Sequence, residues 1–225
     1  MSGSAGGPAG GPGGATPGVR VRALPVGAEA LLLETGSAAE VAALHCELLR
    51  RRDAGELGGV RDIVPAARTV LLDGVADPRA LAARIARWRV APSAVAQGPL
   101  VTVPVRYDGP DLAEVARLWE VPEEEVPGII GATEFRVAFC GFAPGFGYLT
   151  GLPPRLHVPR RATPRTAVPA GSLALAGEYA GVYPRSSPGG WQLIGTTRAV
   201  LWDPAREPEA LFAPGVRVRF AREAP

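Results

Sequence analysis

The chain has 225 residues, a formal net charge of +2, and 47% hydrophobic against 20% charged residues. This balance is typical of a globular protein of one or two domains with a substantial core. The small net charge gives no reason to expect binding to nucleic acid or to an anionic membrane surface. The sequence contains no lysine, which excludes Schiff-base and P-loop lysine chemistry.

Cysteine and histidine are scarce. Cys46 and Cys140, with His45 and His157, are too few for a disulfide framework or a metal centre. We interpret both cysteines as small core residues. No apolar run reaches transmembrane length, and residues 1–18 lack the apolar stretch of a signal peptide. We therefore expect a cytoplasmic protein that binds neither metal nor membrane.

Composition divides the chain into four segments. Residues 1–18 are almost all Gly, Pro, Ala and Ser, which cannot build a core, so we expect a disordered tail. Residues 19–92 predict a small α+β domain with the order β-β-α-β-β-α, and residues 93–99 predict a linker. Residues 100–222 alternate short apolar strands with frequent Gly and Pro, a pattern that favours a closed or nearly closed β-barrel.

Residues that cap the first turn of a helix predict where the helices begin. An S-x-x-E capping box at residues 37–40 and an Asp-Pro pair at Asp77 each predict a helix in the first half. Asp111 is expected to cap the amphipathic helix DLAEVARLWEV in the second half. The acidic run PEEEV could begin a further helix, but we expect Pro127-Gly128 to stop it almost at once.

The stretch FCGFAPGFGYL, residues 139–149, threads aromatic rings through Gly and Pro. Rings give contact area at little cost in rotamer entropy, and Gly and Pro fix where they point, so the stretch predicts the wall of a pocket or an interface. The alternative is a barrel corner whose rings merely plug the end. Further on, Pro recurs every five residues from 159 to 169 and stiffens a chain that carries Arg160, Arg161 and Arg165.

Four motifs, GFAPGFGYL, PRRATPRTAVPAGS, AGEYAGVYP and SPGGWQLIGTT, resemble those of the carboxyltransferase C/D-domain family. That family includes subunit 1 of allophanate hydrolase, the B subunit of bacterial 5-oxoprolinase and a sporulation-kinase inhibitor. The resemblance runs from about residue 19 to 222. It implies an α+β N-terminal domain followed by a mainly β, cyclophilin-like barrel domain.

The resemblance also implies a function. The expected protein is one component of a multisubunit, ATP-dependent 5-oxoprolinase, a hydrolase that opens 5-oxoproline to glutamate, or of a related amidohydrolase. The implied partners are a homologous C-type subunit and an A-type subunit, with ATP bound in the assembled complex. We expect no activity from this chain alone, because it lacks a Walker A pattern. The alternative is a non-catalytic interaction protein that inhibits a histidine kinase.

A site that holds a carboxylate and phosphate oxygens needs guanidinium and N–H donors. We expect Arg160 and Arg165 to bind these anionic groups, with Gly171 and Ser172 donating hydrogen bonds. Arg161, next to Arg160 on an extended chain, is expected to face solvent. No catalytic residue is assigned, because His157, the candidate base, is interpreted as structural. The pocket wall or interface is assigned to Phe142, Pro144, Gly145, Phe146, Tyr148, Tyr183, Ser187, Gly189, Gly190 and Trp191.

Two positions depart from the family pattern. The family often has His where Ile130 stands, and it often reads G-R-T where Gly195-Thr196-Thr197 stands. If the family's His or Arg touches substrate, this chain has altered or lost that contact. A changed substrate, or assembly without activity, therefore remains an alternative.

Overall fold

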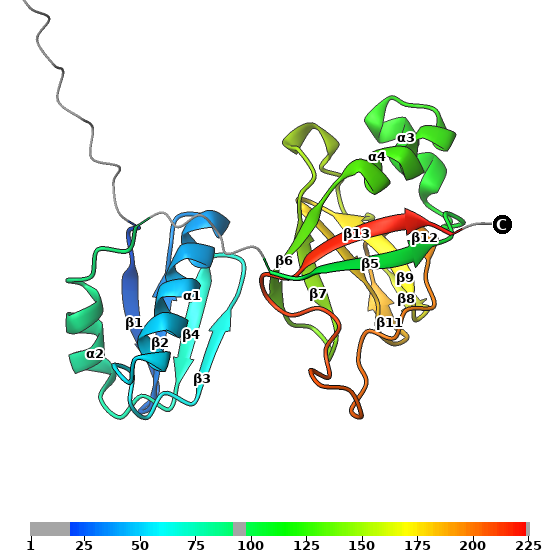
Figure 1. Cartoon of the computed structure of the whole chain (residues 1–225). Coiled ribbons are helices and arrows are strands. Elements are labelled where there is room, and N and C mark those ends of the chain that lie inside the picture. The colour runs from blue at the N-terminus through cyan, green and yellow to red at the C-terminus, as the bar shows by residue number, and fades with distance from the viewer. Residues whose placement is uncertain (1–18, 92–97, 224–225) are drawn as a thin grey trace, which may run out of the picture.

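The computed structural model describes residues 19–91 and 98–223 (Figure 1). The expected tail, residues 1–18, and most of the expected linker lie outside the described residues. An α+β region comes first along the chain, and a mostly β barrel follows it (Figure 1). This arrangement confirms the fold class expected from the sequence.

The N-terminal region is a four-stranded antiparallel sheet in the order β1-β2-β4-β3, with both helices on one face (Figure 1). Its elements are β1 (Arg22–Val26), β2 (Ala30–Glu34), α1 (Ala38–Asp53), β3 (Asp62–Pro65), β4 (Thr69–Asp73) and α2 (Pro78–Ile85). The order β-β-α-β-β-α is the predicted one. Both predicted helix caps are present: the Ser37 hydroxyl accepts the Glu40 N–H, and the Asp77 carboxylate accepts the Ala80 N–H.

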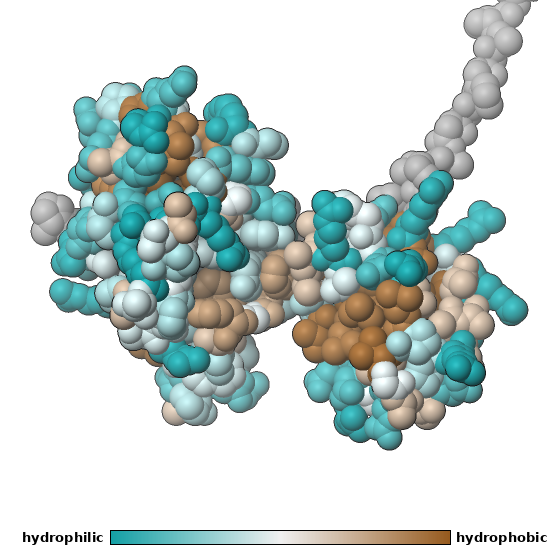
Figure 2. Space-filling view, turned by 180° about the vertical axis from the view of Figure 1, so that it is seen from behind, coloured by the Kyte–Doolittle hydropathy of each residue, from teal (hydrophilic) through white to brown (hydrophobic). Residues whose placement is uncertain are grey.

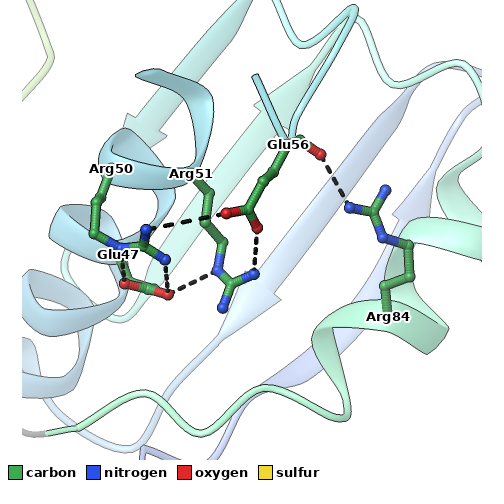
Figure 3. A network of polar contacts seen from close by, with 5 residues as sticks. All are labelled: Glu47, Arg50, Arg51, Glu56 and Arg84. Carbon is green, nitrogen blue, oxygen red and sulfur yellow. Dashed lines mark hydrogen bonds and ion pairs between the residues drawn. The ribbon is translucent and has the colours of Figure 1, made fainter. Parts of the chain in front are cut away.

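A network of charged side chains joins the end of α1 to α2 (Figure 3). Glu47 accepts hydrogen bonds from Arg50 and Arg51 at 2.7–2.8 Å. Arg51 also pairs with Glu56, whose backbone oxygen accepts a hydrogen bond from Arg84 in α2. The hydrogen bond from Arg50, joined by that from Arg51, outweighs the effect of burial and lowers the pKa of Glu47 to about 2. The ionised carboxylate is therefore part of what holds the helices together.

The barrel is a seven-stranded sheet in the order β12-β9-β10-β7-β6-β13-β5. The pair β13 and β5 is parallel and the other pairs are antiparallel. Its strands are β5 (Leu100–Val105), β6 (Phe135–Cys140), β7 (Gly147–Thr150), β9 (Ser172–Ala176), β10 (Tyr179–Val182), β12 (Gln192–Thr196) and β13 (Arg217–Arg222). A two-stranded ribbon, β8 (Arg165–Val168) with β11 (Ser187–Gly189), lies outside this sheet.

The two edges of the barrel meet at one point. Arg106, directly after β5, donates its N–H to the Thr196 carbonyl at 2.8 Å and accepts the Thr196 N–H at 2.7 Å. Gly195 allows this approach, since a Cβ there would lie 2.6 Å from the Arg106 carbonyl oxygen. The nearly closed barrel therefore depends on a residue without a side chain at position 195.

Helices α3 (Leu112–Trp119) and α4 (Val126–Ala132), with two 3₁₀ turns (Glu123–Glu125 and Pro154–Leu156), complete the barrel region. The expectation that Pro127-Gly128 would stop a helix is wrong. Pro127 lies in the first turn of α4, where its missing N–H needs no partner within the helix, so the helix continues to Ala132. No helix within residues 19–91 and 98–223 is long and apolar enough to span a membrane.

Changing Gly195 to Ala should destabilise the barrel, because the added methyl group would collide with the Arg106 carbonyl. We expect a loss of about 1–3 kcal/mol, or a fall in Tm of about 2–12 °C for a chain of this size. Gly128→Ala is the matched control, since a Cβ there meets nothing within 4 Å in a helix. It should leave Tm unchanged or raise it. Equal Tm values for the two variants would contradict the tight closure.

Glu47→Gln should lower Tm at pH 7 and flatten its acid dependence. The folded pKa of Glu47 lies below the ordinary 4.5, so its contribution is present above pH 4.5 and is lost as pH falls towards 2. Partly exposed ion pairs contribute about 1 kcal/mol or less. Thermal melts of both proteins at pH 7, 4.5 and 3 should converge as the pH falls. A constant difference across this range would show that Glu47 is not linked to acid stability.

Candidate functional site

The loop between β6 and β7 carries the GFAPG part of the aromatic stretch. Phe142 has a φ of +69°, a left-handed backbone that non-glycine residues rarely adopt, and is 57% exposed. Gly145 has a φ of +82°, and a Cβ there would lie 3.0 Å from the Leu201 backbone. The loop is thus held against Leu201 while the Phe142 ring remains at the surface.

The other rings of the stretch pack into a cluster centred on Phe146. Its ring centroid lies 5.0–5.5 Å from those of Phe142, Tyr148, Tyr183 and Trp191, in edge-to-face contacts. Phe146 and Tyr183 are 2% exposed and Trp191 is 5% exposed. These three rings fill the inside of a satellite core, whereas Phe142 remains available to a ligand or partner.

Two shallow pockets lie on this side of the barrel. One, of about 430 Å³, is lined by the 140–145 loop, Trp202, Ala210 and Phe212. The other, of about 250 Å³, is lined by Gly171, Tyr183 and residues 197–202, among others. Trp202 lines both pockets and is 42% exposed. The sequence analysis did not single out this residue among the short apolar strands expected in residues 100–222.

Asp111 lies at the centre of a buried ion-pair cluster. Its Oδ1 accepts hydrogen bonds from Arg161 at 2.7 Å and from Arg165 at 2.8 Å, and its Oδ2 accepts the Leu193 N–H at 2.7 Å. Asp111 precedes α3 as predicted, yet its side chain makes no capping hydrogen bond there. The carboxylate instead joins the α3 start, the arginine-bearing segment and β12.

The expectation for Arg161 is wrong. Its side chain is 35% exposed and pairs with Asp111, while the neighbouring Arg160 is the exposed member of the pair. The two neighbouring side chains do point in opposite directions, as expected for an extended chain, but Arg160 rather than Arg161 is the one that faces solvent. Arg165, 21% exposed at its side chain, also pairs with Asp111. A ligand that binds Arg165 would therefore share the guanidinium with an internal carboxylate.

The cluster is not fully satisfied among the described residues. The Arg161 Nε, the Arg165 Nη1 and the Gln192 Oε1 are buried without a hydrogen-bond partner. Two guanidinium groups face one carboxylate, so the group carries a net positive charge. The unpartnered N–H groups fit an added anion or water better than another cation.

Burial by itself would raise the pKa of Asp111. The hydrogen bonds from Arg165 and the Leu193 N–H, with the charges of both arginines, outweigh burial and lower it. The Asp111 carboxylate is therefore ionised at neutral pH. Its contribution to stability is present above the ordinary aspartate pKa and is lost as the pH falls through the lowered value.

The ribbon of β8 and β11 brings several predicted residues together. Arg165 lies opposite Gly189, and a Cβ on Gly189 would lie 2.3 Å from the Tyr183 hydroxyl. Burial raises the pKa of Tyr183, and the nearby charges of Arg160 and Arg165 oppose this effect. Two arginines, a phenol and a glycine backbone thus gather at one place.

Gly171 and Ser172 lie at the start of β9, but their donors are in use. The Gly171 N–H donates to the Tyr183 carbonyl at 2.7 Å, and the Ser172 hydroxyl donates to the Pro169 carbonyl at 2.8 Å. Gly171 has a φ of +79°, and a Cβ there would lie 2.2 Å from the Thr197 oxygen. Their role in this structure is to build the turn; hydrogen bonding to a ligand stays a prediction.

The remaining candidates lie in different surroundings. The Ser187 hydroxyl donates to the Arg185 carbonyl, and Gly190 accepts the Arg161 N–H through its carbonyl. The exposed His157 has a ring nitrogen 3.1 Å from the Leu152 carbonyl oxygen. Across the described part of the chain, no three His, Cys, Asp or Glu side chains are placed to hold a metal ion.

A separate cavity of about 740 Å³ lies between the N-terminal region and the barrel. Side chains of α1 line one wall, including His45 and Cys46, and Arg136 to Phe139 of β6 line the other. None of the predicted anion-binding or wall residues reaches it. Burial, followed by the charge of Arg52, lowers the pKa of His45, so the imidazole remains neutral at physiological pH.

The family model for the carboxyltransferase domain, subdomains C and D, matches residues 21–212. The chain belongs to this family. Two similar proteins are each named as the B subunit of 5-oxoprolinase. The one from Escherichia coli O157:H7 is 47% identical over 141 residues, which are 61% of this chain and 65% of that protein. The one from Haemophilus influenzae is 41% identical over 159 residues, which are 69% of this chain and 75% of that protein.

Among solved structures, TTHA0988 is similar to this chain, with 38% sequence identity and a TM-score of 0.68. The match covers 88% of this chain but 40% of TTHA0988. The chain also spans just under two thirds of the first relative's length. It is thus a homologue of the 5-oxoprolinase B subunit over most of its own length.

The two departures from the carboxyltransferase C/D pattern occupy structural positions. Ile130 is fully buried in the barrel core. Thr196 makes the backbone closure with Arg106, and its hydroxyl donates to the Asp108 carboxylate at 2.8 Å. Both side chains therefore have packing or hydrogen-bonding roles within the chain.

Asp111→Asn should destabilise the barrel, because it leaves two guanidinium groups beside a neutral side chain. Removing one partner of a buried pair costs about 3–5 kcal/mol, and we expect Tm to fall by about 6 °C or more. Asp108→Asn, at a more exposed position with a 36% exposed side chain, is the control and should cost about 1 kcal/mol or less. Similar Tm values for the two variants would show that the cluster is not structural.

Proposed function

We propose that this chain is the B-type subunit of an ATP-dependent 5-oxoprolinase, which opens 5-oxoproline to glutamate. The observation that supports this most is the similarity to two proteins named as the B subunit of 5-oxoprolinase, at 47% and 41% identity. The family match across residues 21–212 extends that support to both parts of the fold. No specific feature favours the alternative of a kinase inhibitor.

The reaction needs an activated carbonyl, since an unactivated lactam opens slowly in water. ATP supplies the phosphoryl group that makes the lactam carbon a good electrophile. This chain would hold negatively charged oxygen atoms, for which Arg160 and the unpartnered Arg165 Nη1 are suited. Phe142, Pro144 and Gly145 would form the wall beside them.

The partners proposed are a homologous C-type subunit and an A-type subunit. The two pockets beside Trp202 are shallow and small, about 430 and 250 Å³, which suits half of a composite site that a partner completes. The residues present fit an anion better than a whole nucleotide, because the sequence has no Walker A pattern. An enzyme that uses ATP works where ATP is available, so the proposal places it in the cytoplasm.

The assembled enzyme tests this proposal directly. We expect ATP hydrolysis that depends on 5-oxoproline when this chain is mixed with C-type and A-type subunits, and none from this chain alone. Glutamate formation measured in the same mixture should match the ATP consumed. Turnover by the purified chain alone, or no turnover in the full mixture, would overturn the proposal.

Arg160→Ala in that mixture should reduce the 5-oxoproline-dependent rate about tenfold or more, because hydrogen bonds to charged groups are worth roughly 1.5–3 kcal/mol. Arg160 is exposed, so Tm should not change. Arg160→Lys should recover part of the rate, since the charge returns without the planar fork. Arg155→Ala, at another exposed arginine of the same segment, is the control and should keep the rate. An unchanged rate in Arg160→Ala would remove Arg160 from the site.

A further inference from the structure

The N-terminal sheet has two apolar faces, and the described chain covers one of them. Leu31 and Leu33 of β2, with Val70 and Leu72 of β4, are 0% exposed and pack in the core shared with α1 and α2. The residues between them on each strand point to the other face. That face turns away from the helices.

Register brings four aliphatic side chains into one row on this open face. Leu24 lies opposite Leu32, Leu32 opposite Leu71, and Leu71 opposite Val64. The row, here called the open-face row, crosses all four strands. Val64 is 45% exposed, as is Val26, which follows Leu24 by two residues on β1 at the other edge of the sheet. Figure 2, seen from the side opposite the helices, shows an apolar patch on the N-terminal region.

The strand sequences fit a sheet that is covered on both sides. β2 reads ALLLE and β4 reads TVLLD, which are apolar runs rather than alternations. An antiparallel sheet with one face in water usually alternates apolar and polar residues. Contiguous apolar surface of this kind marks an interaction site.

Opposite charges flank the open-face row. At the end of the sheet near Thr35, three arginines accompany two glutamates: Arg20, Arg22, Arg68, Glu34 and Glu40. At the other end, three carboxylates accompany one arginine: Glu29, Asp62, Asp73 and Arg61. The first end carries a net positive charge and the second a net negative charge. The row of aliphatic residues lies between them.

We propose that a second copy of this chain docks on the open face, related by a two-fold axis that lies in the interface and runs perpendicular to the strands. This operation reverses the strand direction, so that the arginine end of one copy lies over the carboxylate end of the other. The open-face row then meets its own copy at the centre. An axis along the strands would instead place like charges together.

The charge pattern indicates that the molecule docked on the open face is a second copy of this chain. A two-fold interface must be complementary to itself, because the same patch serves both copies. An apolar centre with opposite charges at its two ends meets this condition. A different partner requires no such balance on this face.

The first test is the oligomeric state of the full chain by sedimentation velocity across a range of concentrations. We expect a dimer of twice 23.3 kDa. Val64→Asp should raise the dimer Kd at least tenfold, because it places a charge in the apolar centre. Val200→Asp is the matched control: Val200 is 59% exposed on the barrel, and its variant should keep the Kd. Thermal melts on both variants check that each is folded.

A monomeric wild-type chain at all concentrations would overturn the proposal, as would equal Kd values for the two variants. If the wild-type chain is monomeric and Val64→Asp instead abolishes binding to another subunit, the open face belongs to that subunit and the second-copy assignment is wrong. These results do not depend on catalysis, so they separate this proposal from the proposed function.

The second test addresses the axis by charge reversal. Arg22→Glu makes the arginine end less positive, and Asp62→Arg makes the carboxylate end less negative, so each change should weaken the dimer severalfold. An axis along the strands would instead place like charges together, so each change would then lower the dimer Kd. A lower dimer Kd in either variant than in the wild-type chain would overturn this orientation.

Discussion

The arrangement of the candidate site depends on one buried carboxylate. Asp111, at the start of α3, receives hydrogen bonds from two guanidinium groups of the arginine-bearing segment and from a backbone N–H of β12. This carboxylate, together with the backbone pairing of the segment to Gly189 and Gly190, fixes where Arg161 and Arg165 lie. Arg160 directly precedes Arg161 in the extended chain, so its side chain points outward. A charge inside the protein thus sets the position of a charge outside it.

The aromatic stretch shows how the same residues serve packing and recognition. Phe146 is buried with Tyr183 and Trp191 in the satellite core, and Tyr148 packs against them while partly exposed. The strained backbone at Phe142 keeps one ring at the surface beside Trp202. Such strain persists only where surrounding contacts determine the loop, and the close approach of Gly145 to Leu201 supplies one of them. Phe146 therefore fits the plug interpretation, whereas a role of Phe142 in the wall of a functional pocket stays a prediction.

Much of the fold could be predicted from local signals, because capping residues and apolar periodicity act within a few residues. The N-terminal element order and the caps at Ser37 and Asp77 are examples. The helix through Pro127 was missed, since proline is tolerated in a first turn and the sequence does not show where that turn begins. The use of Asp111 could not be predicted, because its partners lie 50, 54 and 82 residues away. Trp202 was missed for the same reason: its role depends on a loop some sixty residues earlier in the chain.

The strand order of the barrel has a consequence for how the chain reaches this state. β5 is paired with β13, and β13 lies between β5 and β6. The first strand of the barrel therefore joins the sheet through the last one, across more than a hundred residues. Contacts between distant parts of a chain slow folding, because loop entropy is lost before they form. During synthesis, all strands of the N-terminal sheet are made early, whereas the barrel sheet stays incomplete until β13 has been made.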